Sequence, residues 1–186
     1  MNTNKMAKMA ILSAFSIILV TLIHFPIIPS APFLEYDPAD VPILIGTFMY
    51  GPLAGLMITI VVSFIQAVTV SAGSGWVGFV MHVIATGTLV LVAGSIYKKK
   101  HTFVGAIIAL VAGSLSMTLI MIPANLFFTV KFWGIPYEVV KGMLLPAIIP
   151  FNLIKSFANS VITVLIYKSI ANILRSYPKI TTENTK

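Results

Sequence analysis

The chain has 186 residues, of which 58% are hydrophobic and only 9% are charged. A soluble domain carries roughly a quarter charged residues, so this chain has too few charges to cover a water-facing surface, and the lipid bilayer must be the solvent for most of that surface. Cysteine is absent, which excludes disulfides and thiol chemistry, and the net charge of +7 is interpreted as a signal of membrane topology and not of nucleic-acid binding.

The first hydrophobic segment predicts a helix from about Lys5 to His24. Prolines at three-residue spacing follow it and predict an extended or turning backbone over residues 25–34, because proline fixes φ and lacks a backbone donor. The next stretch, 35–42, holds three of the five acidic residues of the chain. A charged, irregular segment therefore separates the first helix from the rest.

An apolar run from Val41 to Val70 is interrupted by the helix-breaking pair at 51–52. The piece after the break is about 28 Å long as a helix and nearly spans a bilayer, whereas the piece before it gives only about 15 Å. The acidic loop before the shorter piece must therefore dip inward. Irregular backbone at that depth is tolerated only inside protein or beside a watery cavity, so we expect this loop to line a cavity.

Three further helices are expected at 75–97, 103–130 and 150–174. A basic hairpin separates the first two, and a loop from Lys131 to about Leu145 precedes the last. The expected fold is an all-α integral membrane protein: a bundle of six transmembrane helices that forms a single membrane-embedded domain over residues 1–186, with a flexible tail from about residue 176.

The cationic residues lie mostly on one side of this expected bundle. With the N-terminus inside, two lie in outer loops, Lys131 and Lys141, and Lys155 lies within the last helix. The other nine lie on the inner face: Lys5, Lys8, Lys98, Lys99, Lys100, Lys168, Arg175, Lys179 and Lys186. Because cytoplasmic loops carry an excess of lysine and arginine, we predict a multi-pass protein of the cell (plasma) membrane with both termini cytoplasmic and the acidic loop outside.

Lys155 lies about one turn below the outer surface, where a charge indicates function by default; the alternative is that it snorkels to the nearby interface. Asn152 and Asn159 share its helix face. Carboxamides both donate and accept hydrogen bonds, which suits a planar heterocycle with alternating carbonyl and imide groups. The alternative for both residues is hydrogen bonding between helices, and for the deeper Asn159 we favour that alternative.

Asn125 follows Pro123, which frees a backbone carbonyl, and a site role and a packing role are evenly balanced for it. The carboxylates of Glu35, Asp37 and Asp40 are able to accept hydrogen bonds from a polyol. The alternative is that Asp37 or Asp40 only caps the next helix.

Other candidates are weaker. Tyr36, Trp76 and Phe128 have aromatic rings that either stack on a ligand or serve as interfacial or core residues. Three isolated polar residues are interpreted as structural, with satisfied hydrogen bonds: His24, Gln66 and His82.

Ala10 and Ala14 form an AxxxA motif, and small residues at this spacing let another helix approach closely. The sequence has no P-loop motif, no nucleophile–base pair and no metal-ligand constellation. Uphill transport therefore requires energy from a partner or an ion. Rival hypotheses are an intramembrane enzyme with Lys155 or His82 as base, a structural subunit without ligand, and a self-sufficient secondary transporter.

Three motifs carry a resemblance to a known family: FLEYDPADVPILIG at 33–46, GPLAG at 51–55 and PFNLIK at 150–155. They resemble the substrate-binding membrane subunits (S components) of energy-coupling factor (ECF) transporters, most closely the riboflavin-binding branch. The resemblance implies a non-enzymatic subunit that binds riboflavin or FMN from outside, has no cofactor of its own, and works with a transmembrane coupling subunit and two ATPase subunits. A binding subunit for another vitamin is the nearest alternative.

The resemblance also implies residue roles. Asn125, Asn152 and Lys155 match the positions that hydrogen-bond the isoalloxazine ring, and the loop around Glu35 and Asp37 matches the part that meets the ribityl chain. The full set of expected ligand-binding residues is Glu35, Tyr36, Asp37, Asp40, Asn125, Asn152 and Lys155. Ala10 and Ala14 match the motif that docks on the coupling subunit.

Overall fold

The computed structural model describes the backbone of residues 3–176 and the side chains of residues 3–167. The expected flexible tail, with Lys179 and Lys186, lies outside the described residues.

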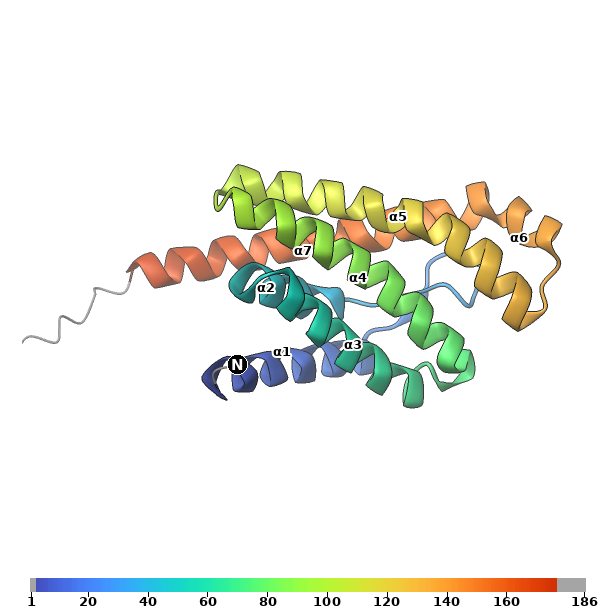
Figure 1. The fold of residues 1–186 in the computed structure, drawn as a ribbon, viewed down its shortest axis with the longest axis horizontal. Coiled ribbons are helices and arrows are strands. Elements are labelled where there is room, and N and C mark those ends of the chain that lie inside the picture. Colours follow the sequence, from blue (N-terminus) through green and yellow to red (C-terminus); the bar gives the residue numbers. More distant parts are fainter. Residues whose placement is uncertain (1–2, 177–186) are drawn as a thin grey trace, which may run out of the picture.

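Helices account for nearly all of the described chain (Figure 1). They are α1 (Thr3–Leu22), α2 (Asp40–Tyr50), α3 (Pro52–Val68), α4 (Gly75–Lys99), α5 (Phe103–Trp133), α6 (Tyr137–Met143) and α7 (Ile149–Ser176), with the short turns η1 (Ala72–Ser74) and η2 (Leu144–Ile148). A two-residue antiparallel pair, β1 (Phe25–Pro26) with β2 (Glu35–Tyr36), lies in the loop between α1 and α2.

Within the described residues, four stretches are long and apolar enough to cross a membrane: α1, η1 with α4, α5, and Tyr137–Tyr167. The apolar helices α2 and α3 are shorter. Large hydrophobic side chains are exposed on the outside of the bundle, for example Leu119 at 65% and Leu145 at 79%. Such a surface is stable only against lipid.

The break between α2 and α3 falls where the sequence predicts it. Gly51 has φ 93° and Pro52 occupies the first turn of α3. A positive φ is accessible to glycine without steric cost, and proline fits the start of a helix because its missing N–H has no partner there. The break turns the chain back, so that α2 and α3 pack against each other.

The expected loop from Lys131 to Leu145 is wrong. Helix α5 continues to Trp133 and ends at Gly134, whose φ of 69° is the left-handed conformation common at helix ends. Pro136 then starts α6, and the chain stays helical through η2 into α7. The break at Gly134–Pro136 is short, so the polar residues on either side of it belong to helices and not to a long loop.

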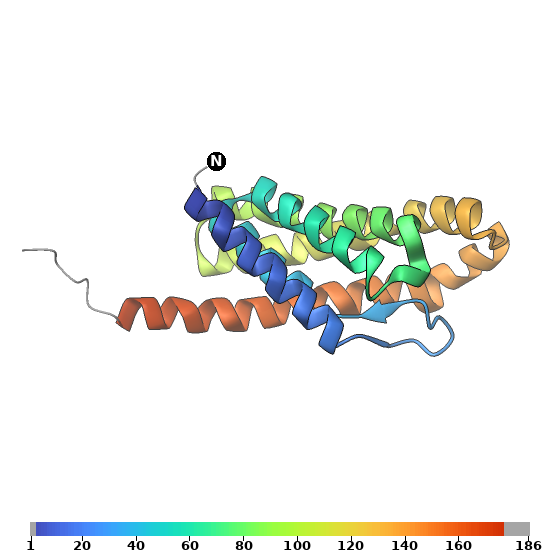
Figure 2. The same cartoon turned by 90° about the horizontal axis from the view of Figure 1, so that it is seen from below.

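The bundle has two distinct ends (Figure 1). The hairpin end holds the α4–α5 turn and the α2–α3 break, and the η1 end holds η1, α6 and the loop between α1 and α2, which we call the β-loop (residues 23–39). Figure 2 shows the β-loop running beside α7, and hydrogen bonds from Tyr36 and Asp37 to α7 place it there.

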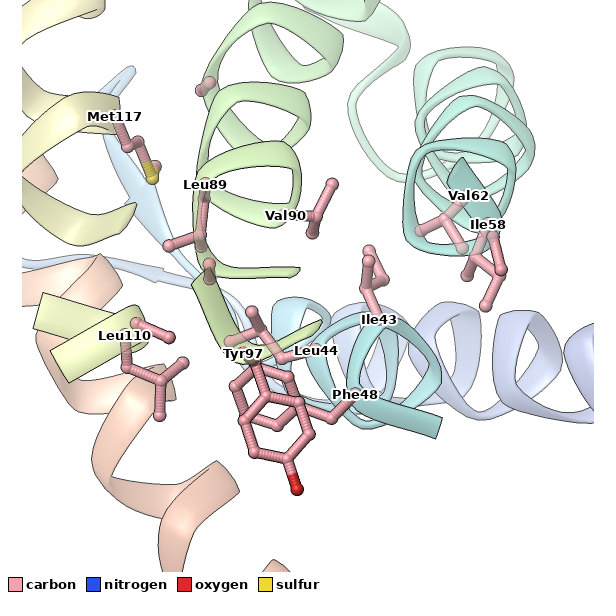
Figure 3. Close-up of a cluster of buried hydrophobic side chains, with 14 of the residues drawn as sticks. Ile43, Leu44, Phe48, Ile58, Val62, Leu89, Val90, Tyr97, Leu110 and Met117 are labelled. Atoms are coloured by element: carbon pink, nitrogen blue, oxygen red, sulfur yellow. The ribbon is translucent and has the colours of Figure 1, made fainter. Parts of the chain in front are cut away.

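The apolar core lies mainly among α2, α3, α4 and α5 (Figure 3). Near the hairpin end, the rings of Phe48 and Tyr97 lie 4.4 Å apart between centroids. Gly94 lets α4 approach the α2–α3 break closely: a Cβ there would lie 2.9 Å from the Pro52 Cα.

Candidate ligand-binding site

A cavity of about 300 Å³ lies at the η1 end, lined by α1, α3, η1, α4, α5, α7 and the β-loop. This volume is at the lower end of the range typical of small-molecule pockets. Of the seven expected ligand-binding residues, five line the cavity: Glu35, Asp37, Asn125, Asn152 and Lys155. Residues of the acidic loop and of the polar face of the last helix, up to 120 positions apart in sequence, therefore meet at one cavity.

Lys155 is buried, with 6% of its surface exposed, and its Nζ donates to the Asp37 Oδ2 at 2.6 Å. The snorkelling alternative is therefore wrong. An ammonium has three N–H donors, and one of them is used on Asp37. The remaining donors are available to a molecule in the cavity.

Asp37 connects the β-loop to α7. Its Oδ1 accepts from the backbone N–H of Ala39 at 3.0 Å, while its Oδ2 accepts from Lys155. Burial by itself raises the pKa of the Asp37 carboxyl, but the Lys155 charge, together with the nearby His82 and the hydrogen bonds from Lys155 and Ala39, outweighs burial and holds that pKa below its ordinary value. Burial, with the nearby Asp37 charge, raises the pKa of the Tyr36 phenol, so this side chain stays a hydrogen-bond donor.

Tyr36 and Asp40 lie behind the cavity wall, where both bond to Asn159. The Tyr36 hydroxyl donates to Asn159 Oδ1 at 3.0 Å, and Asn159 Nδ2 donates to Asp40 Oδ2 at 3.2 Å. Thr86 on α4 donates to the other Asp40 oxygen at 2.8 Å. Asn159 thus has the structural role that we favoured, and direct ligand contact by Tyr36 and Asp40 stays a prediction.

The capping alternative holds only in part. The residue before α2 is Ala39, which makes no side-chain cap bond, and Asp40 lies inside the first helical turn with its oxygens bonded to other elements. Only Asp37 bonds a backbone N–H at this helix start.

The side-chain carboxamides of Asn125 on α5 and Asn152 on α7 are both buried. Asn125 on α5 donates to the carbonyl of Met121 at 2.8 Å, and Asn152 on α7 donates to the carbonyl of Ile148 at 2.7 Å. Asn125 also accepts from Thr129 at 3.3 Å. These bonds to their own helices fix the orientation of both amides, which keeps the entropy cost of a ligand contact small.

Two cavity residues carry a polar atom without a partner. Gln66 Oε1 and His82 Nε2 are buried and are the only such side-chain atoms of the described chain without a hydrogen-bond partner. Each residue makes one other bond, Gln66 to Ser71 and His82 to Ser63, so the expected full hydrogen bonding is wrong for both, and their structural role stays a prediction. His24 also lines the cavity, and its Nδ1 bonds the Val20 carbonyl. A lone polar residue in an apolar helix carries no signal of what lies opposite it.

The aromatic candidates from the sequence are not those at the cavity. Trp76 packs against Phe132 with ring centroids 4.7 Å apart, and neither Trp76 nor Phe128 lines the cavity. The aromatic side chains that do line it are Phe33, Phe79, Trp133 and Phe151. Flat apolar groups thus lie beside the buried carboxamides, as recognition of a planar ring requires.

A second feature lies on α1. Ala10 and Ala14 are exposed and line an apolar groove between α1 and α3, together with Met6, Met9, Ser13, Ile17, Met57, Ile58, Val61 and Ile65. The two alanines therefore leave room on the outer surface of the bundle for another helix.

A family model described as "ECF transporter, substrate-specific component" matches residues 4–167. The chain belongs to this family. An S component is a subunit of a transporter, so the enzyme alternative is excluded, and the chain is a multi-pass membrane protein that works with an ECF module.

Relatives and a solved structure agree. The riboflavin transporter RibU of Staphylococcus aureus is 32% identical over 94% of this chain and 95% of its own length. The riboflavin transporter FmnP of Bacillus subtilis is 28% identical over 90% of this chain and 92% of its own length. A solved S component of a bacterial ECF transporter has a TM-score of 0.79 and 32% identity, and the match covers 92% of this chain and 98% of that one. The expected family and all-α membrane fold are confirmed.

Proposed function

We propose that this S component binds riboflavin in the cavity at the η1 end and presents it for ATP-driven uptake. The observation that carries the proposal is the combination of two buried carboxamides and a buried lysine with aromatic side chains in one cavity. The names of the relatives, all riboflavin transporters, support the same ligand.

In this proposal the isoalloxazine ring lies between the aromatic side chains, and Asn125, Asn152 and Lys155 hydrogen-bond its polar edge. The carbonyl and imide groups of that edge need both acceptors and donors, which carboxamides and an ammonium provide together. Glu35 and Asp37 meet the ribityl chain from the β-loop. Tyr36 and Asp40 lie behind the cavity wall and contribute by holding that loop against α7 through Asn159.

The charge of the cavity favours riboflavin over FMN. Its lining carries two carboxylates, on Glu35 and Asp37, and one lysine, which is already paired with Asp37. A phosphate group would meet Glu35 without a free cation to compensate it, and like charges in a partly desolvated site repel. We therefore expect FMN to compete poorly.

The orientation and the partners follow the same proposal. The η1 end faces outside, both termini are cytoplasmic, and the site opens to the outside of the plasma membrane. Helix α1 docks through Ala10 and Ala14 on the transmembrane coupling subunit, and two ATPase subunits supply the energy.

Ligand binding is tested by purifying the chain in mild detergent from riboflavin-fed cells, followed by absorption spectra and titration with riboflavin and FMN. We expect a yellow protein that quenches riboflavin fluorescence at one equivalent, with FMN far weaker. Asn152→Ala should weaken binding by about 1–3 kcal/mol, whereas Thr118→Val, whose hydroxyl bonds only its own helix, should not. A colourless protein that quenches no riboflavin would contradict the proposal.

Docking is tested separately with Ala10→Leu and Ala14→Leu in cells that contain the coupling module. Both variants should bind riboflavin normally after purification but fail to co-purify with the coupling subunit. Thr21→Leu enlarges another exposed position of α1 and serves as the matched control. Normal uptake by both alanine variants would exclude this surface.

A further inference from the structure

The two sides of the cavity differ in chemistry. The side formed by α5 and α7 presents thioether, aromatic, carboxamide and ammonium groups: Met117, Met121, Asn125, Phe151, Asn152 and Lys155. The side formed by α3, η1 and α4 also has apolar side chains, among them Phe79 and Met81, but its polar groups are hydroxyl, amide and imidazole groups: Ser63, Gln66, Ser71, Ser74, His82 and Thr86. The first composition suits a flat ring with one polar edge, and the second suits a chain of hydroxyl groups.

The two unpartnered atoms lie on the second side. Ser63 Oγ lies 2.7 Å from His82 Nδ1, and the tautomer of the ring decides which of the two atoms donates. This bond occupies Nδ1 and leaves Nε2 without a partner. Gln66 Nε2 contacts Ser71 Oγ at 3.5 Å, which leaves Gln66 Oε1 as an acceptor.

Two buried polar atoms without partners are costly. Both atoms are almost fully shielded from solvent, so a ligand meets them after the side chains turn toward the cavity, and each then gains a full hydrogen bond because no bond to water is lost. A hydroxyl group both donates and accepts. A polyol carries several hydroxyls and therefore serves both atoms, whereas a planar ring edge is already served by the carboxamides on the other side.

We propose that Gln66 and His82 are specificity-determining residues that hydrogen-bond the polyol chain of the ligand through Gln66 Oε1 and His82 Nε2. This inference rests on the proposed binding of a flavin with a polyol substituent. It assigns the selection of the side chain to α3 and α4, and the selection of the ring to α5 and α7.

The test compares riboflavin with lumiflavin, which has the same ring system but a methyl group in place of the polyol chain. Purified wild type should bind riboflavin more tightly than lumiflavin. Gln66→Leu and His82→Asn should weaken riboflavin binding by about 5- to 100-fold and leave lumiflavin binding unchanged. Asn152→Ala should weaken both.

Two substitutions of His82 separate ligand contact from a structural role. Asparagine reproduces the Nδ1 position, which serves Ser63, and glutamine reproduces the Nε2 position. We expect His82→Gln to retain most of the preference for riboflavin and His82→Asn to lose it. Thr59→Ala removes a buried hydroxyl that bonds within α3 and is the matched control.

Each outcome is decisive. Equal weakening of riboflavin and lumiflavin by Gln66→Leu and His82→Asn would overturn the inference, as would equal affinity of the wild type for both flavins, and the proposed flavin binding would stand. A wild type that binds neither flavin would remove the proposed function and this inference with it. Retention of the preference by His82→Asn and its loss in His82→Gln would show that His82 acts through Ser63.

Discussion

The two ends of the bundle are stabilised in different ways. At the hairpin end, side chains such as Leu110 and Val90 belong to the buried apolar core. At the η1 end, Asp37, Lys155 and Asn159 form a buried polar network that connects the β-loop with α7. In a bilayer the apolar end depends on close packing, because lipid is as apolar as the core, whereas the polar end depends on every buried group having a partner.

The difference shows that stability and binding are separated along the bundle. Gly94 and Pro52 bring helices into contact at the hairpin end, and none of the residues there lines the cavity. Substitutions at the two ends should therefore have different signatures, with stability alone affected at one end and both properties affected at the other.

The largest expected effect comes from the buried ion pair. Lys155→Met leaves the Asp37 carboxylate buried without its cation, which should destabilise the protein by about 3–5 kcal/mol, measured as thermal unfolding in detergent. In the double variant with Asp37→Leu most of this stability should return, because no unpaired charge remains. Equal stability of the single and double variants would show that the two charges do not act as a pair.

A cavity at the hairpin end should come next. Leu110 is 2% exposed, and Leu110→Ala should cost roughly 2–4 kcal/mol of stability through lost packing. Because the residue does not line the cavity, riboflavin affinity measured at a temperature where the variant is folded should equal that of the wild type. A change in affinity would mean that the two ends are coupled.

Thr86→Val keeps the side-chain shape but leaves Asp40 Oδ1 without its donor. The expected loss of stability is about 1–3 kcal/mol, measured by thermal unfolding. Thr118→Val is the control, since the Thr118 hydroxyl donates only to the Ser114 carbonyl of its own helix. If both variants lose the same amount of stability, the bond from Thr86 to Asp40 contributes no more than a hydroxyl bond within one helix.

A smaller effect is expected at the hairpin end from Tyr97→Phe. The hydroxyls of Tyr97 and Tyr167 lie 2.7 Å apart, and losing this bond should cost about 0.5–1.5 kcal/mol while the ring packing on Phe48 is kept. Thermal unfolding should shift slightly and binding should not change. Double substitution with Tyr167→Phe should add little, because the bond is already lost.

The smallest effect is expected from pH. Because the Asp37 pKa is lowered in the folded state, its contribution is fully present above the ordinary value of 3.8 and is lost as pH falls through the lower folded value. Stability and affinity should therefore show no transition from Asp37 in the range from neutral to mildly acidic pH. A loss of binding centred well above 3.8 would show that Asp37 is not paired with Lys155.

Much of the site could be predicted, because its residues either lie at helical spacing on one face or carry a charge whose burial in a membrane is energetically costly. Asn152 and Lys155 lie three apart on one helix face, and a charge at that depth is rare, so both stood out. The short segment before Gly51 indicated that the acidic loop dips inward. The specific pairing of Asp37 with Lys155 could not be predicted, because it depends on the path of the β-loop through the bundle.

Other parts of the site and of the fold could not be predicted from local sequence patterns. Gln66 and His82 lie on helices whose faces meet only in the folded bundle, and a single polar residue in an apolar run is more often satisfied than not. Helix α6 was missed because Gly134 and Pro136 end α5 in a break so short that the next helix begins at once, whereas the sequence pattern was interpreted as a longer loop. Phe151 and Trp133 gave no signal, since aromatic residues are common throughout membrane helices.

The bond between Asp37 and Lys155 also bears on how fast a ligand exchanges. The β-loop lines one side of the cavity and is held to α7 by this pair and by Tyr36. A ligand that leaves by displacing the loop breaks these bonds, so the barrier to that route includes their separation in addition to the contacts of the ligand itself. Because the pair is shielded from solvent, dissolved salt screens it weakly, and the residence time of the ligand should depend little on ionic strength.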